Sequence, residues 1–212
     1  LAPLTRFTVH RLADDRWRLT FTQSHAITEG WSYHQMLMEL LADYRDRRDG
    51  RVPTHPEPPA VRYADFIAAE QAALDSASDR AFWAELVADH PRLELPATWR
   101  PRQTAEPEMI LGGVRLESVE AGLRALAVRA RVSMKAVFLA AHLKVLSQLT
   151  AQDRFCTGLV WDTRPEAAGA DRVLGMHLNT LPCKGQRPTG SWTEWVQRVF
   201  ADELAAFAHR RL

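Results

Sequence analysis

A change of hydrophobic period near the N-terminus constrains the fold of this chain more than any other feature. From Arg18 to His25 apolar and polar residues alternate, which is typical of a β-strand with one half-buried face. That face carries Leu19, Phe21, Gln23 and His25. Gly30 interrupts the pattern, and from Ser32 the apolar residues follow helical spacing. The sequence therefore predicts a strand ending at His25, a glycine turn and an amphipathic helix in direct succession.

Helical and strand-like segments are mixed along the rest of the chain. Apolar spacing predicts further helices over residues 63–74, 82–87, 119–126, 133–149 and 192–207. Short apolar runs predict strands over residues 113–116, 155–160 and 176–181. Two Pro-containing stretches, residues 52–59 and 95–107, are expected to be connectors. This order of elements predicts the α/β or α+β class.

Composition and charge argue against several classes of function. The chain has 27 basic and 26 acidic residues, and no basic block with interleaved aromatic residues indicates a nucleic-acid surface. The most apolar helix, residues 136–149, contains His142 and Lys144 and is too short to span a bilayer. Cys156 and Cys183 are expected to be buried free thiols. No zinc, zincin or P-loop motif is present, so we expect no metal. The charge pattern and the short apolar helix lead us to expect no nucleic-acid or membrane partner.

His25, Glu29 and Gly30 form the strongest candidate site. A neutral imidazole can accept a proton from an amine or hydroxyl, and its ordinary pKa of about 6.5 suits that exchange near neutral pH. Gly30 removes a side chain where a substrate or backbone approaches closely. Ser24 and His25 face opposite sides of a strand, which argues against a Ser-His-Glu triad. The other candidate histidines are expected to be ordinary polar or partly buried residues: His34, His142 and His177.

Four stretches resemble the condensation domains of nonribosomal peptide synthetases. The family carries a His-His-x-x-x-Asp-Gly motif followed by Trp-Ser, and the run here is Ser24-His25-Ala26-Ile27-Thr28-Glu29-Gly30-Trp31-Ser32. Tyr63-Ala64-Asp65-Phe66 with Phe82-Trp83 is similar to the helical connector of the family. Leu95-Pro96-Ala97 to Pro101 is similar to its Leu-Pro crossing segment. The run from Gly175 to Pro182 is similar to its Gly-x-Phe-Val-Asn-Thr-Leu-Pro strand.

The resemblance implies a chloramphenicol-acetyltransferase-like fold, in which two similar subdomains form a V. Residues 1–95 would then form the C-terminal part of the first subdomain, with the His motif and the helical connector. Residues 96–212 would form the N-terminal part of the second. The chain begins without Met, and roughly half of a complete domain is expected to be absent. That half is also expected to supply the cover of the Trp-rich stripe over residues 192–207.

The resemblance also implies a reaction and roles for the candidate residues. The family joins a donor acyl thioester to an acceptor aminoacyl thioester, and His25 would orient or deprotonate the attacking amine. Glu29 would be a strut that pairs with Arg164, and Gly30 would leave room beside the reacting centre. Trp31, Ser32 and Asn179 would line the substrate channel.

The partners implied by the resemblance are carrier proteins and adjacent synthetase domains, in the cytoplasm. The carrier proteins deliver both substrates on phosphopantetheine arms, and the domain itself binds no cofactor.

Two departures from the family pattern leave alternatives open. Ser24 replaces the first His of the motif, and Glu29 replaces its Asp with one additional methylene. The rival hypotheses within enzymes are an epimerisation domain and an ester-forming relative that use the same His. A rival from a different class is a condensation-like docking domain that has lost catalysis.

Overall fold

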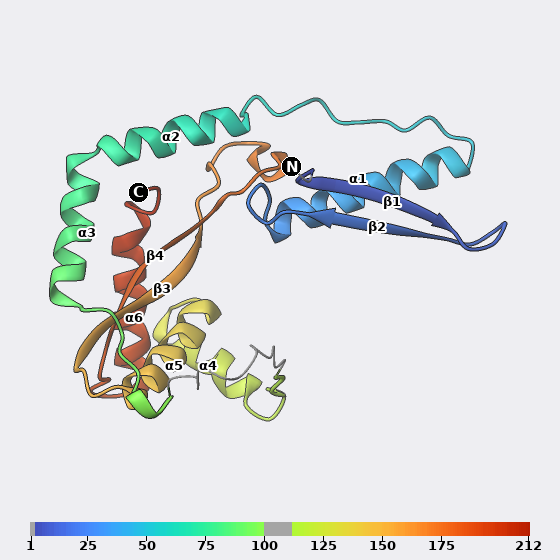
Figure 1. The fold of residues 1–212 in the computed structure, drawn as a ribbon. Helices are drawn as coiled ribbons and strands as arrows, with labels where there is room; N and C mark the ends of the chain where they lie inside the picture. The colour runs from blue at the N-terminus through green and yellow to red at the C-terminus, as the bar shows by residue number, and fades with distance from the viewer. Residues whose placement is uncertain (1–2, 100–111) are drawn as a thin grey trace. The chain divides into compact units, whose positions relative to one another are not determined.

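The computed structural model describes residues 3–99 and 112–212, and Figure 1 shows the order of its elements. The strands are β1 (Thr5–Arg11), β2 (Trp17–Gln23), β3 (Arg154–Asp162) and β4 (Leu178–Gln186). The helices are α1 (Gly30–Arg48), α2 (Tyr63–Asp75), α3 (Ala77–Asp89), α4 (Glu120–Ala130), α5 (Met134–Leu149) and α6 (Trp192–Phe207). Short 3₁₀ turns cover Ala97–Trp99 and Ala170–Arg172. This mixture of helices and small sheets confirms the predicted class.

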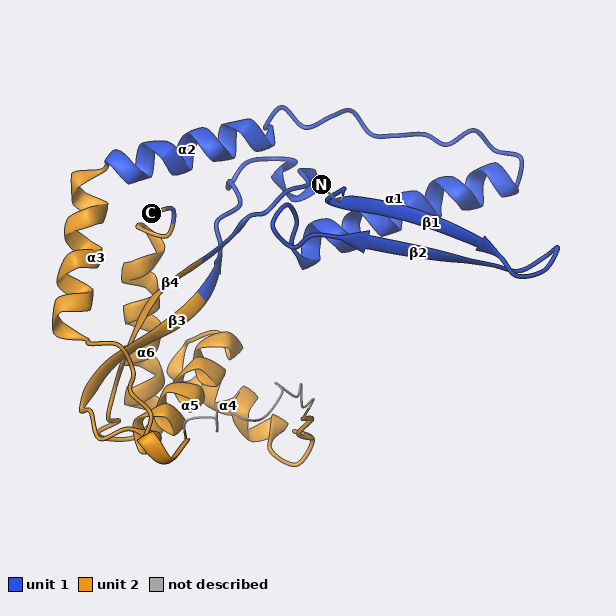
Figure 2. Ribbon diagram, in the orientation of Figure 1, with its two compact units in different colours: residues 1–75, 160–179, 211 blue, residues 76–159, 180–210, 212 orange. Residues whose placement is uncertain are grey.

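The chain separates into two compact units (Figure 2). The first comprises residues 1–75 and 160–179, and the second comprises residues 76–159 and 180–210. The two units are defined by the contacts that residues of this chain make with one another. The predicted division at residue 95 concerns the two subdomains of a complete family member and stays a prediction.

In the first unit, a two-stranded hairpin packs against α1. β1 and β2 pair antiparallel, from Thr5 opposite Gln23 to Arg11 opposite Trp17. The ring of Phe21 stacks on Tyr33 of α1 with centroids 5.3 Å apart. The strand β1 was not predicted, because its short apolar pattern becomes a strand only through pairing with β2.

The second unit has its core between three helices and one strand. Buried side chains from these elements form one cluster, which includes Val137, Leu143, Phe155, Trp195 and Val199. The indole Nε1 of Trp195 donates to the carbonyl of Ala140 at 2.9 Å. The central part of the α6 stripe is therefore covered by α4 and α5, and the expectation that its cover lies outside the chain is wrong for these residues.

Three strand predictions are corrected by the structure. Residues 113–116 form no strand, because no segment within residues 3–99 and 112–212 pairs with them. β3 extends slightly beyond the predicted residues 155–160 at both ends, and β4 begins at Leu178 instead of Met176. Part of the predicted connector over residues 95–107 lies outside the described residues.

Cys156 and Cys183 lie on the paired strands β3 and β4 as free, partly buried thiols. Burial raises the pKa of the Cys183 thiol to about 12, and the charges of Glu203 and Asp202 add to this effect. The thiol of Cys183 therefore stays protonated near neutral pH.

Within the described parts of the chain, no single helix is long and apolar enough to cross a membrane. The bent pair α4–α5 passes that test only by length and composition.

Candidate functional site

The strand β2 ends two residues before His25. Gln23 is its last residue, and His25 lies in the following turn with an exposed side chain. Ser24 anchors this turn, since its backbone N–H donates to the carbonyl of Leu4 at 2.8 Å and its Oγ accepts from the N–H of Ala26 at 3.3 Å. The predicted strand end at His25 is thus corrected to Gln23, and Ser24 has a local structural role.

Glu29 is the N-cap of α1. Its Oε2 accepts from the N–H of Trp31 at 2.6 Å, and its Oε1 accepts from the N–H of Ser32 at 3.0 Å. The helix therefore begins at Gly30 and not at the predicted Ser32. Sequence reasoning missed this cap because Ser, Thr, Asp and Asn are the preferred N-cap residues. A negative charge at this end also interacts favourably with the helix dipole.

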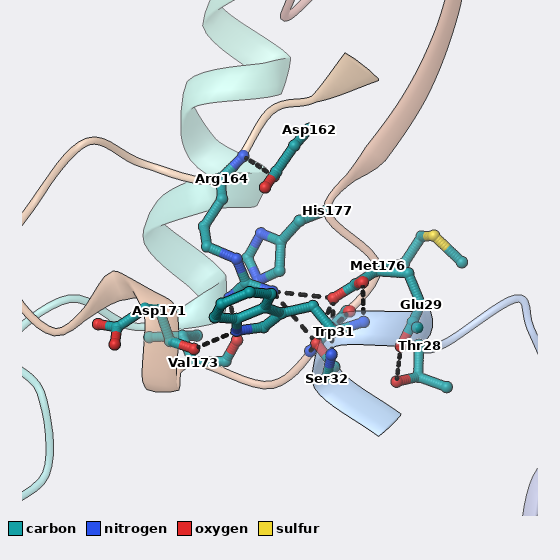
Figure 3. A network of polar contacts seen from close by, with 12 residues as sticks. Thr28, Glu29, Trp31, Ser32, Asp162, Arg164, Asp171, Val173, Met176 and His177 are labelled. Atoms are coloured by element: carbon teal, nitrogen blue, oxygen red, sulfur yellow. Dashed lines mark hydrogen bonds and ion pairs between the residues drawn. The ribbon is translucent and has the colours of Figure 1, made fainter. Parts of the chain in front are cut away.

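Arg164 completes a buried ion pair with the same carboxylate. Its Nη2 donates to Glu29 Oε1 at 2.8 Å, and the two side chains are only 9% and 5% exposed (Figure 3). Its Nη1 donates to the carbonyls of Ala170 and Val173 at 2.8 and 2.5 Å. The structure thus brings together the two residues that the resemblance paired, although 134 residues separate them in the sequence.

Ser32 connects α1 to the loop before β4. It is 1% exposed, and its hydroxyl lies 2.6 Å from Glu29 Oε1. The same Oγ accepts from the N–H of Gly175 at 3.1 Å and lies 3.0 Å from its carbonyl oxygen. Ser32 therefore belongs to this buried network, and the place on a channel wall that the resemblance implied for it stays a prediction.

The net effect of this network keeps Glu29 ionised. Burial alone raises the pKa of the carboxyl, but hydrogen bonds from the side chain and backbone of Ser32, a further bond from Trp31 and the charge of Arg164 outweigh it. The pKa of Glu29 is therefore below its ordinary value. A carboxylate held in this way is a strut and a poor proton acceptor.

His177 is a member of the site that sequence reasoning treated as ordinary. It is 0% exposed, and its ring lies 5.2 Å from Tyr63 and 4.6 Å from Phe66, measured between centroids. Neither ring nitrogen has a hydrogen bond of good geometry within the described residues. Burial lowers its pKa, the charge of Arg164 adds to this, and the carbonyl of Val173 opposes it only in part. One signal in the sequence could have indicated this burial: His177 occupies the position at which the similar strand of the condensation-domain family has Phe.

Gly175 allows the loop before β4 to approach α2. A Cβ at this position would lie 2.3 Å from two ring carbons of Tyr63. The Tyr63 hydroxyl donates to the carbonyl of Met176 at 3.0 Å, which holds the ring there. This close approach explains why residue 175 has no side chain.

His25 borders a small cavity of about 240 Å³ in the first unit. Its walls are formed by Phe21, Gln23, His25, Thr28, Glu29, Gly30 and Tyr33. A Cβ on Gly30 would meet no atom within 4 Å, so Gly30 leaves open space here and no backbone approaches it closely. The imidazole of His25 is exposed beside this cavity, whereas the carboxylate of Glu29 is held by Arg164 and Ser32.

Trp31 and Asn179 are not among the residues that line this cavity. The indole of Trp31 is 59% exposed and donates from Nε1 to the carbonyl of Asp171 at 2.8 Å. Asn179 lies on β4 with a partly buried side chain. Within the described residues, no group of three or more His, Cys, Asp or Glu side chains is placed to hold a metal ion.

Comparison with known proteins supports the resemblance along the whole chain. The family described as "Condensation domain" matches residues 1–212. The AMB antimetabolite synthetase AmbE of Pseudomonas aeruginosa is 36% identical over 211 residues, which span 99% of this chain and 10% of that protein.

Solved structures give the same result for the fold. The first condensation domain of the CDA synthetase superposes with a TM-score of 0.75 at 25% identity and matches 99% of this chain. The X-domain from teicoplanin biosynthesis, solved in complex with OxyB, superposes with a TM-score of 0.76 at 21% identity. This chain spans 47% of the first structure and 48% of the second.

Proposed function

This chain belongs to the condensation-domain family of nonribosomal peptide synthetases, and from that premise we propose that it forms an amide bond between two carrier-bound substrates. A donor acyl group and an acceptor aminoacyl group would arrive as thioesters on phosphopantetheine arms of carrier proteins. The acceptor amine attacks the donor carbonyl, so that a C–N bond forms and the C–S bond breaks. The amine loses one proton and the departing thiolate gains one.

His25 is the residue that we assign to this proton transfer. Its imidazole is exposed at the cavity, where it can orient the amine or accept its proton. The observation that carries the proposal is a difference in burial between the two ionisable residues of the motif: His25 is exposed, and Glu29 is buried. Because Glu29 is buried against Arg164 and Ser32, His25 is left as the motif's accessible proton acceptor.

Substitution of His25 tests the proposal in the complete condensation domain with loaded donor and acceptor carrier proteins. We expect the wild type to release amide product and His25→Ala to lose at least about 100-fold in rate, which is the ordinary contribution of general acid–base catalysis. His10→Ala is the matched control, because His10 is exposed on β1 and does not line the cavity. Equal rates for His25→Ala and wild type would contradict the role of His25.

A non-catalytic docking domain is a second candidate. It is favoured by the two departures at Ser24 and Glu29, which alter the catalytic motif of the family. In that case no donor–acceptor pair would give product, and His25→Ala in the intact synthetase would leave the yield of the final peptide unchanged. An isomerised but uncondensed acyl group would instead indicate epimerisation, and an ester with a free alcohol would indicate an ester-forming relative.

A further inference from the structure

Ser24 joins the end of the hairpin sheet to the turn that carries His25. Its backbone N–H donates to the carbonyl of Leu4 at 2.8 Å, which adds one hydrogen bond to the ladder between β1 and β2. Its carbonyl accepts from the N–H of Ile27 at 3.3 Å, so residues 24–27 form a β-turn with His25 as the second residue. The backbone of Ser24 therefore fixes where this turn begins.

The hydroxyl of Ser24 holds the middle of the same turn. Its Oγ accepts from the N–H of Ala26 at 3.3 Å, and this N–H has no other acceptor within residues 3–99 and 112–212. Serine is favoured as the first residue of a β-turn, because its side-chain oxygen can accept from the backbone two residues further on. Without this oxygen, no hydrogen bond from the described residues would orient the N–H that directly follows His25.

The chain is anchored a second time on the other side of His25. Glu29 caps α1 and pairs with Arg164, four residues further along the chain. Ser24 is thus the anchor that directly adjoins the imidazole. Such an anchor affects the rate of a reaction, because a displacement of about 1 Å at a reacting group can cost on the order of 100-fold.

We propose that Ser24 is a positioning residue, whose hydroxyl holds the turn that presents the imidazole of His25 at the cavity. The proposal rests on the proposed function, in which His25 orients the acceptor amine or accepts its proton. Ser24 is not among the residues that line the cavity, so it acts only through His25. The serine at the first His position of the family motif then preserves the geometry of the site.

Two variants of equal shape isolate the hydroxyl in the complete domain with loaded carrier proteins. Ser24→Val and Ser24→Thr are both branched at Cβ, but only threonine keeps the oxygen. We expect Ser24→Val to lower kcat for amide formation by about threefold to tenfold, the effect of one hydrogen bond, at an unchanged KM for the acceptor carrier protein. Ser24→Thr is expected to keep the wild-type kcat.

Two further variants control for the shape and the position of the substitution. Ser24→Asn is expected to keep the wild-type kcat, because its side-chain oxygen can accept from the same backbone N–H. Thr22→Val removes a hydroxyl from an exposed position on β2 outside the turn, and it is expected to leave kcat unchanged.

Three results would overturn the proposal while the proposed function stands. Ser24→Val could have the same kcat as both Ser24→Thr and Ser24→Asn, or it could raise KM and leave kcat unchanged. A lower melting temperature of Ser24→Val at an unchanged kcat would show that the hydroxyl stabilises the fold without positioning His25.

If the wild type condenses no pair of substrates, the proposed function fails, and amide hydrogen exchange decides whether Ser24 holds the turn. We expect the N–H of Ala26, followed by NMR in the complete domain, to exchange about threefold to tenfold faster in Ser24→Val than in wild type or Ser24→Thr. Equal exchange in the three proteins would overturn the role of the hydroxyl.

Discussion

The carboxylate of Glu29 performs two structural tasks at once. It caps the first turn of α1 through Trp31 and Ser32, and it pairs with Arg164. The longer Glu side chain therefore performs the structural role that the resemblance gave to the motif's Asp. Because both partners are almost fully buried, removal of either leaves a desolvated charge or an unpaired acceptor.

We expect Arg164→Leu to lower the free energy of unfolding by about 3–5 kcal/mol, since the ionised Glu29 would stay buried without its partner. Urea denaturation of the complete domain measures this change. Arg124→Leu is the matched control, because Arg124 pairs with Glu120 on the exposed surface of α4 and such pairs contribute about 1 kcal/mol or less. Similar losses in the two variants would show that burial of the Glu29–Arg164 pair has no special effect.

The buried ring of His177 predicts a loss of stability in acid. Its folded pKa is lowered, so below about pH 6.5 the unfolded chain takes up a proton that the folded chain refuses. The free energy of unfolding is therefore expected to fall as the pH drops from 6.5 toward the folded pKa. Glu29 also loses stability in acid, but only below its unfolded pKa of about 4.5.

His177→Phe removes this titration and restores the residue of the similar strand. We expect the free energy of unfolding of the variant, relative to that of wild type, to rise as the pH is lowered from 8 to 5. Both pH values lie above the range in which Glu29 takes up a proton. Urea denaturation at both pH values measures the difference. If the difference in free energy of unfolding between the two proteins is the same at pH 5 and pH 8, protonation of His177 does not cause the loss of stability in acid.

At the scale of elements, the approach of the loop before β4 to α2 depends on Gly175. Gly175→Ala would place a methyl group against the ring of Tyr63, and we expect a loss of about 1–3 kcal/mol from overpacking. Gly122→Ala is the control, because its Cβ on α4 meets no neighbour, and alanine is expected to stabilise that helix by about 0.5–1 kcal/mol. A neutral effect at residue 175 would mean that the Tyr63 ring moves aside freely.

At the scale of the whole molecule, the hairpin and α1 leave an apolar groove of about 400 Å³ in the first unit. It is lined by Val9, Trp17, Leu19, Leu40, Leu41 and Tyr44. Exposed apolar patches of this kind promote association. We expect the 212-residue chain by itself to associate with rising concentration in sedimentation velocity.

Two lysines in the groove are expected to reduce this association. Val9→Lys with Leu41→Lys introduces charge at exposed groove positions, whereas Val52→Lys adds charge on the exposed connector before α2. Only the double variant should sediment more nearly as a monomer. A wild-type chain that stays monomeric at every concentration would contradict this prediction.

Local patterns determined the features of this protein that depend on neighbouring residues. The predicted helix over residues 192–207 coincides with α6, because Ser191 caps it and the apolar period continues along its length. The predicted helix over residues 133–149 is also present as α5, where Ser133 is the N-cap and its Oγ accepts from the N–H of Ala136. The motif around His25 marks the segment of the chain that borders the cavity.

Only the tertiary structure decided the environment of the site. The pairing of β1 with β2 and the burial of Ser32 and His177 depend on contacts that no local period encodes. Ser32 meets Gly175 across 143 residues, and the burial of each partner depends on the other. Periodicity reports which face of an element is apolar. It cannot report which distant segment covers that face, and burial by distant segments is what separates an accessible histidine from a buried strut.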